Sequence, residues 1–320
     1  MKKLISILLV AALAVMCLSG CTATPATPDD TPEIVTTVFP IRDWVGQVLG
    51  DNPGYMGVTW LLDSGVDMHS YQPGVNDLLD ISTCDLFIYV GGESDAWVRD
   101  ALKNPENPDM IVLDLVDVLG DAALEEERAE GMQSEPGEAE ETEYDEHVWL
   151  SLRNAALFTR KIAEAIASLD PAHADVYTAN ANAYCDKLAA LDADYEQAVA
   201  ASSHKTVLFG DRFPFRYLTE DYGLTYYAAF AGCSAETEAS FETVTFLAGK
   251  VDELGLPAVL TIEGATHQIA QTIVNNTRAK NQRILTLDSL QSTTAEAAEN
   301  GTTYLSVMQA NLTILKQALA

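Results

Sequence analysis

The sequence predicts an α/β protein of two lobes, each a mostly parallel four-stranded sheet with flanking helices. Short runs of β-branched and apolar residues recur in two sets of four, and most intervals between the runs could hold a helix. Two helical stretches separate the sets. The chain has 320 residues, 48% of them hydrophobic, which is enough for one large domain or two ordinary ones.

The first twenty residues have the pattern of a signal peptide. Lys2 and Lys3 precede an apolar run, residues 4–16, that is short for a membrane-spanning helix. The ending Leu18-Ser19-Gly20-Cys21 resembles a bacterial lipobox, which implies cleavage before Cys21 and lipid attachment to its sulfur. A plain secretory signal is the alternative. Residues 21–33 are expected to form an extended tether, which places the protein outside the cytoplasm on a lipid anchor in the bacterial cell membrane.

The N-terminal lobe is expected over residues 34–152 and the C-terminal lobe over residues 204–320. The predicted strands are 34–39, 58–62, 86–90 and 110–113, then 206–209, 225–230, 258–262 and 283–287. The predicted helices are 43–49, 75–79, 96–102, 241–254 and 269–277.

Residues 153–203 are predicted to connect the lobes as two helices. Apolar residues from Phe158 to Leu169 recur at spacings of three and four, and Asp170-Pro171 then starts a second helix. The same spacing continues from Tyr177 to Val199, which predicts one long amphipathic helix. Its tyrosines are interpreted as core residues rather than as a sugar-binding face. Such a helix would join the lobes stiffly, unlike a Gly/Ser linker.

The charge of the chain is strongly negative. It has 18 basic and 48 acidic residues, for a formal net charge of −30. This argues against nucleic acid as a partner, because phosphates require a basic surface. The glutamate-rich segment 121–146 is expected to be a mobile acidic loop. It is either a solvated insertion or a weak collector of cations near the mouth of a site.

Three cysteines follow Cys21, namely Cys84, Cys185 and Cys233, and none lies in a Cys-x-x-Cys metal motif. One disulfide with a free thiol and three buried thiols are both open from the sequence.

Two histidines lie at positions suited to metal binding. His69, in Asp67-Met68-His69-Ser70-Tyr71-Gln72-Pro73, follows a predicted strand in a loop. His147 ends the acidic segment, directly before the apolar run Val148-Trp149-Leu150. A neutral imidazole in such a loop is a good ligand for a transition metal.

Three carboxylates of the C-terminal lobe are each predicted just past the end of a strand. Asp211 follows 206–209, Glu263 follows 258–262 and Asp288 follows 283–287. In open parallel sheets those strand ends form the ligand crevice. Together with the histidines they suit Zn(II), Mn(II) or Fe(II).

These features together resemble the zinc/manganese solute-binding lipoproteins of ABC importers, the ZnuA-like family. The matching segments span nearly the whole mature chain, and they are the lipobox, residues 34–40, 67–73, 85–89, 147–150, 215–218 with 222–224, and 287–290. The resemblance implies two α/β lobes joined by a long rigid helix, with a bound Zn2+ or Mn2+ between them as cargo. It also implies delivery to an ABC permease by a protein that we expect to be a monomer.

The resemblance also suggests the ligands. His69 and His147 match the two ligands of the N-terminal lobe, and Asp288 matches the carboxylate of the C-terminal lobe. Arg212 stands where the family has His or Glu, and a guanidinium cannot coordinate a metal. Asp211, one residue earlier, is the proposed substitute.

Two residues are held in reserve as ligands. Glu263 matches a family glutamate near the cleft, and His267 would share its helix face if that segment were helical. Arg212 is expected to turn away and to pair with Glu263 or Glu236.

Three classes of function are consistent with this pattern. The leading one is a binding protein, not an enzyme. A metal-dependent hydrolase is an alternative, but neither His-Glu-x-x-His nor Gly-x-Ser-x-Gly occurs. A surface adhesin with a structural metal is the third.

Overall fold

The computed structural model describes residues 31–51, 56–133, 143–234, 238–264 and 266–320. The chain divides into two units, Met1–Thr31 and Pro32–Ala320, and all the described helices and strands belong to the second. The predicted signal peptide, Cys21 and most of the tether lie outside the described residues. Within the described ranges, no helix combines the length and apolarity needed to cross a membrane.

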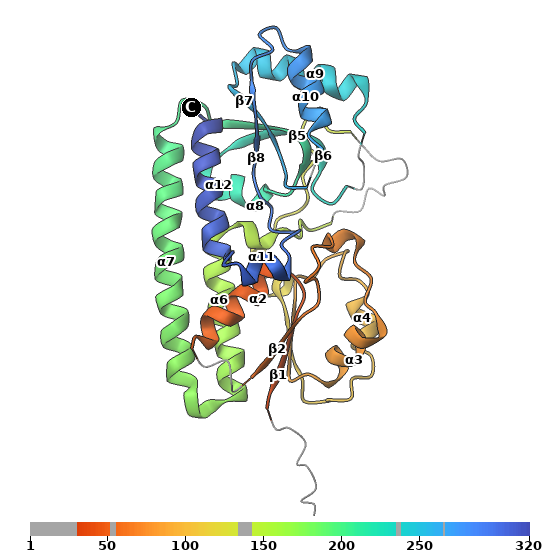
Figure 1. Cartoon of the computed structure of the whole chain (residues 1–320), viewed down its shortest axis with the longest axis vertical. Coiled ribbons are helices and arrows are strands. Elements are labelled where there is room, and N and C mark those ends of the chain that lie inside the picture. The colour runs from red at the N-terminus through yellow and green to blue at the C-terminus, as the bar shows by residue number, and fades with distance from the viewer. Residues whose placement is uncertain (1–30, 52–55, 134–142, 235–237, 265) are drawn as a thin grey trace, which may run out of the picture. The chain divides into compact units, whose positions relative to one another are not determined.

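Two four-stranded parallel sheets form the framework, as predicted (Figure 1). The first has the order β2-β1-β3-β4 and the second the order β6-β5-β7-β8. All the strand pairs are parallel. The strands are β1 (Glu33–Thr36), β2 (Gly57–Trp60), β3 (Leu86–Tyr89), β4 (Ile111–Asp114), β5 (Thr206–Phe213), β6 (Thr225–Ala231), β7 (Ala258–Thr261) and β8 (Arg283–Thr286).

Strand β5 is longer than the sequence predicts. It continues through Phe213, and its register against β6 shifts between Phe209 and Arg212. Asp211 therefore lies inside the strand at this irregularity, and its predicted place beyond the strand end is wrong. Gly210 marks the irregularity, since a Cβ there would come within 2.5 Å of the Ala270 backbone. The glycine thus allows a neighbouring helix to pack directly on the strand.

Helices flank both sheets, and all five that were predicted within the lobes are present. In the N-terminal lobe they are α2 (Phe39–Leu49), α3 (Val75–Thr83), α4 (Val98–Ala101) and α5 (Leu115–Leu119). In the C-terminal lobe they are α8 (Arg216–Tyr222), α9 (Phe241–Leu254), α10 (Gln268–Asn276) and α12 (Tyr304–Ala318). Helix α11 (Ala295–Glu299) lies beside α2 of the N-terminal lobe, where the Ala295 amide donates to the Asp63 carbonyl at 2.7 Å (Figure 1).

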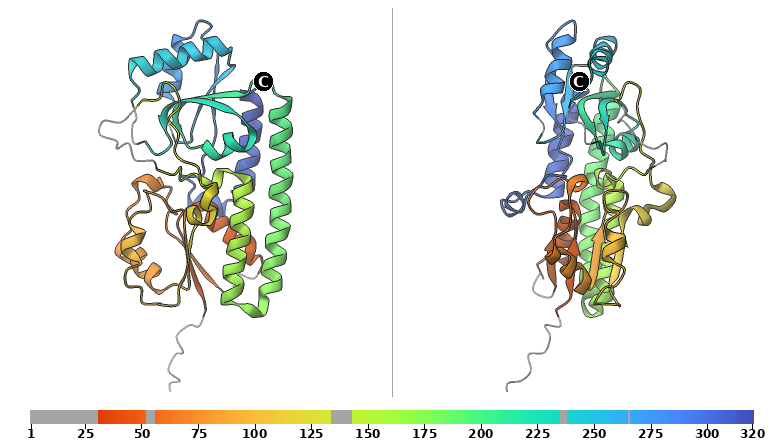
Figure 2. Two further views of the ribbon diagram at one scale, coloured as in Figure 1. Left: turned by 180° about the vertical axis from the view of Figure 1, so that it is seen from behind. Right: turned by 90° about the vertical axis from the view of Figure 1, so that its right-hand side faces the viewer.

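The predicted connection consists of α6 (Leu152–Leu169) and the 28-residue α7 (Ala174–Ala201). Helix α7 runs beside α6 and α12 in both views that show its length (Figures 1 and 2). Near its start, Asn180 Nδ2 donates to the Val48 carbonyl of α2 at 2.9 Å. Near its end, Tyr195 Oη donates to the Met308 carbonyl of α12 at 2.6 Å. One rigid helix is thus hydrogen-bonded to elements of both lobes.

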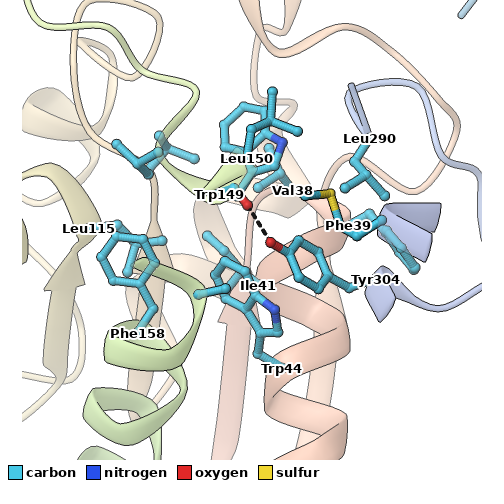
Figure 3. Close-up of a cluster of buried hydrophobic side chains, with 14 of the residues drawn as sticks. Val38, Phe39, Ile41, Trp44, Leu115, Trp149, Leu150, Phe158, Leu290 and Tyr304 are labelled. Atoms are coloured by element: carbon cyan, nitrogen blue, oxygen red, sulfur yellow. Dashed lines mark hydrogen bonds between the residues drawn. The ribbon is translucent and has the colours of Figure 1, made fainter. Parts of the chain in front are cut away.

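A buried aromatic cluster lies where the lobes meet (Figure 3). Tyr304, at the start of α12, packs edge-on against Trp44 of α2, with ring centroids 5.2 Å apart. Its hydroxyl donates to the Trp149 carbonyl at 2.6 Å, and Trp149 Nε1 donates to the Ser289 carbonyl at 2.8 Å. The 3-10 turn Val148–Leu150, which directly follows His147, is therefore fixed to the C-terminal lobe.

The described part of the acidic segment makes several hydrogen bonds and an ion pair. The Glu126 amide donates to the Glu143 carbonyl at 2.8 Å, and the Gln133 amide donates to the Ala229 carbonyl of β6 at 2.9 Å. Arg216 pairs with Glu127 at 3.2 Å. Over its described part, the segment therefore contacts the C-terminal lobe through Gln133 and Glu127.

Candidate metal centre

His69 is held at the end of the β2 loop by its neighbours. The Asp67 carboxylate accepts the His69 backbone N–H at 3.1 Å and caps the 3-10 turn Met68–Ser70. The ring Nδ1 lies 2.7 Å from Ser94 Oγ and 3.5 Å from Glu146 Oε2. Nδ1 is thus engaged on the protein side, which directs Nε2 to a ligand.

His147 is fully buried, and Asp145 orients it. One oxygen, Asp145 Oδ1, accepts the His147 backbone N–H at 2.8 Å and lies 3.1 Å from ring Nδ1. From this partner we infer that Nδ1 bears the proton, which leaves the lone pair of Nε2 free to bind metal. Gly232 makes room for the ring, since a Cβ there would lie 2.9 Å from His147 Cε1.

The two free ring nitrogens face each other. His69 Nε2 and His147 Nε2 are 3.2 Å apart. Two nitrogens bound tetrahedrally at about 2.0–2.1 Å from one zinc ion would be about 3.3–3.4 Å apart. Without metal, the same separation fits a hydrogen bond in which one Nε2 donates to the other. The two Nε2 atoms are therefore already spaced to bind one ion, which would take the place of the proton they share in the metal-free protein.

Cys233 is the third member of this group. Among the residues that the structure describes, one ligand atom from each of His69, His147 and Cys233 lies within 4.8 Å of the others. Cys84, Cys185 and Cys233 are all free thiols, which removes the disulfide alternative; the first two are buried and Cys233 is half-buried. Cys233 is not among the ligands predicted from the sequence. The sequence could have indicated it, because Cys233 lies just past the end of β6, as Asp288 lies just past the end of β8.

The surroundings set the protonation of the two imidazoles differently. Burial, followed by the charge of His147, lowers the pKa of His69 to about 3. Burial also acts to lower the pKa of His147, but the charge and hydrogen bond of Asp145 outweigh it and raise that pKa above its usual value. His69 is consequently neutral, and so able to bind metal, throughout the physiological range.

Arg212 does not pair as the sequence suggested. Its Nη2 lies 2.6 Å from Asp67 Oδ2, whereas the expected partner was Glu263 or Glu236. Glu236 lies outside the described residues, and Glu263 accepts the N–H and hydroxyl of Ser289 instead. Arg212 has not turned away from the histidines, because Asp67, its partner, also lies 4.0 Å from His69 Nε2. Asp67 balances the charge of Arg212 from the N-terminal lobe.

Asp211 lies in a cavity beside the histidine group. Its Oδ1 accepts the Arg212 N–H at 2.9 Å, and its Oδ2 accepts the Ile262 N–H at 3.3 Å. The cavity, about 460 Å³ in volume, is also lined by the two reserve residues, Glu263 and His267. His267 precedes α10 with a φ of 58°, so no helix places these two on one face. Asp211, Glu263 and His267 do not belong to the group formed by His69, His147 and Cys233.

Asp288 occupies the loop after β8, which is hydrogen-bonded to Trp149. Its Oδ1 accepts the Leu290 N–H at 2.8 Å, and the next residue, Ser289, accepts the Trp149 indole N–H. Burial and the neighbouring charge of Glu263 raise the pKa of Asp288 to about 6. Its neighbour Ser289 contacts the turn after His147, but Asp288 does not belong to the group formed by His69, His147 and Cys233.

Comparison with known proteins identifies the family. The ZnuA family, described as the periplasmic component A of a zinc-uptake complex, matches residues 34–318. The chain belongs to this family. Its two four-stranded parallel sheets agree with the fold that the sequence predicted, and the family is named for zinc uptake.

Several ZnuA-family relatives are named for zinc. The zinc-binding lipoprotein AdcA of Streptococcus pneumoniae is 30% identical over 321 residues, covering 99% of this chain but 61% of that protein. The high-affinity zinc uptake system protein ZnuA of Bacillus subtilis is 28% identical, covering 91% of this chain and 88% of that one. The chain thus spans about three fifths of the length of AdcA.

A solved ZnuA-like structure also matches closely. The Zn(II)-bound ZnuA-like domain of Streptococcus pneumoniae AdcA superimposes with a TM-score of 0.71 at 27% identity. The match covers 90% of this chain and 99% of that domain, so it includes both lobes.

Proposed function

We propose that this chain is an extracytoplasmic binding protein that captures zinc or manganese between its lobes and delivers it to an ABC permease. The central observation is the histidine pair, whose Nε2 atoms lie 3.2 Å apart while each Nδ1 is engaged by the protein. Two oriented nitrogen donors in a buried position suit a tightly held transition metal.

The proposed ligands are His69 and His147 with carboxylates of the C-terminal lobe. Asp288 is supported by the bond from Trp149 to Ser289, which ties its loop to the turn after His147. Asp211 remains the second carboxylate proposed from the sequence, although both of its oxygens accept backbone N–H groups. A filled shell of protein ligands leaves no place for a reactive water, which favours capture over hydrolysis.

We also propose that lipid on Cys21 anchors the chain to the cell membrane and that it acts as a monomer. The lipobox and the name of its lipoprotein relative support the anchor. No observation in the described residues favours the hydrolase or the adhesin alternative over capture.

Metal titration tests this function. The mature chain, purified without chelator, is expected to bind one zinc or manganese ion. His147→Ala should weaken zinc binding by at least about 100-fold, because a buried nitrogen donor is lost. His173→Ala is the matched control, since His173 pairs with Asp170 at the start of the long helix. Equal zinc affinity in the wild type and His147→Ala would refute the proposal.

Delivery requires a separate assay. In cells that lack this chain but retain the permease, zinc uptake is expected to return with the wild type and not with His147→Ala. Uptake that is equal with both proteins would contradict capture through this histidine.

A further inference from the structure

We propose that Cys233 is a metal ligand, binding through its thiolate with His69 and His147, and that its sulfur makes the site prefer zinc over manganese. This inference rests on the proposed metal-capture function. In this proposal Cys233, rather than Asp211, supplies the ligand that is missing because Arg212 stands where the family has His or Glu.

The convergence of three ligand atoms is the geometric basis. Ligand atoms of His69, His147 and Cys233 lie mutually within 4.8 Å, and the three side chains come from separate segments. In a tetrahedral zinc site with Zn–S of about 2.3 Å, sulfur and nitrogen would be about 3.5 Å apart. A small movement of the Cys233 side chain would therefore complete three corners of the site.

The backbone around Cys233 is built for close approach. Cys233 follows Gly232, and a Cβ at Gly232 would lie 2.9 Å from His147 Cε1 and 3.0 Å from the Phe213 carbonyl. Only a residue without a side chain can bring the end of β6 this near to the imidazole. The Cys233 amide donates to Glu126 Oε1 at 3.4 Å, which helps to hold the loop.

A buried carboxylate also faces His69. Glu146 is 1% exposed, and within the described part of the chain its Oε2 has no hydrogen-bond partner. That oxygen lies 3.5 Å from His69 Nδ1. A metal on Nε2 would make the His69 ring more positive and require a proton on Nδ1, so that the ring could donate toward this oxygen. An ion on Nε2 would thus strengthen the contact between His69 and Glu146.

The chemistry at sulfur is a simple exchange. As the metal approaches, the Sγ–H proton leaves to solvent and a metal–sulfur bond forms, with no change in oxidation state. Burial, followed by the charges of Glu146, Glu126 and Asp145, raises the pKa of the Cys233 thiol. The same negative charges favour a cation bound to the sulfur. Thiolate is a soft ligand that selects zinc, whereas manganese favours carboxylate oxygen. A Cys233 site is therefore zinc-selective, while an Asp211 site would favour manganese more.

The experiment uses the mature chain and Co2+ as a spectroscopic probe. The wild type should show a near-ultraviolet sulfur-to-cobalt charge-transfer band, and Cys233→Ser should lose it. Cys84→Ser is the matched control because Cys84 is a buried thiol whose Sγ contacts Met110. Cys233→Ser should weaken zinc binding about 100-fold and manganese binding less than about threefold.

The outcomes separate this inference from the function on which it rests. If Cys233→Ser keeps the band and the zinc-to-manganese ratio while His147→Ala loses affinity, the thiol assignment is wrong and metal capture stands. A loss of zinc affinity in Asp211→Asn but not in Cys233→Ser would return the role to Asp211. If the wild type binds no metal, both proposals fail.

A measurement on the wild type tests the same assignment without relying on variants that could misfold. X-ray absorption of the zinc-loaded chain should show one sulfur neighbour at about 2.3 Å. A coordination shell of nitrogen and oxygen alone would overturn the assignment of Cys233.

Discussion

At His147, a single carboxylate fixes both the position and the tautomer of the ring. Asp145 Oδ1 accepts the backbone N–H and faces Nδ1, so the ring cannot rotate without losing a bond. The sequence could predict His69 and His147, because each lies in a short motif. It could not predict the partner of Arg212, since Asp67 lies 145 positions away and meets it only in the folded chain.

Zinc affinity should fall as the pH is lowered through the pKa of His147, which is raised above 6.5. Zinc binds the ring only when Nε2 has no proton, so below that pKa each pH unit costs up to about tenfold in affinity for this one group. His69, with a pKa of about 3, adds nothing in this range.

Asp145→Asn tests the cause of this pH dependence. Removing the carboxylate charge should lower the pKa of His147, so the acid loss of affinity should move to lower pH. Competition with a chelator between about pH 5 and 8 measures both curves. A curve for Asp145→Asn that coincides with the wild-type curve would contradict the assigned role of Asp145.

At the scale of elements, the turn Val148–Leu150 holds the histidine site to the core. The Trp149 carbonyl accepts a hydrogen bond from Tyr304, and the Trp149 indole N–H donates to the Ser289 carbonyl. Both partners belong to the C-terminal lobe. The alternation of strands and helices predicted the eight strands, because apolar runs and their spacing are local signals. It could not predict the extension of β5, because the irregularity at Gly210 depends on how closely α10 packs.

Tyr304→Phe should lower the free energy of unfolding by about 1–3 kcal/mol, because the buried Trp149 carbonyl loses its hydrogen-bond donor. Denaturant unfolding measures the effect. Tyr144→Phe is the control, since the Tyr144 side chain is 52% exposed. A change within about 0.5 kcal/mol for Tyr304→Phe, similar to that of a surface substitution, would show that this bond does not stabilise the junction.

At the scale of the whole molecule, one ion pair spans the lobes next to the histidines. Arg212 of β5 and Asp67 of the His69 loop are 2.6 Å apart, with side chains 20% and 23% exposed. The family resemblance predicted two lobes and a rigid connecting helix, because the matching segments span nearly the whole mature chain. It did not predict how Arg212 is accommodated, because that is where the chain departs from the family pattern.

A double-mutant cycle of Arg212→Ala and Asp67→Ala should give a coupling of about 1–2 kcal/mol in the free energy of unfolding. This value lies between those of exposed and buried pairs, because the two side chains are partly exposed. Arg153→Ala with Glu196→Ala is a matched surface cycle that should give less, since those side chains are 44% and 58% exposed. Equal couplings in the two cycles would mean that the pair between the lobes has no special role.

The location of zinc in the loaded protein tests capture by the histidine pair most directly. Anomalous diffraction at the zinc edge should place one ion about 2.0–2.1 Å from both His69 Nε2 and His147 Nε2. A single zinc peak that contacts neither imidazole, for example in the cavity lined by Asp211, Glu263 and His267, would contradict the account.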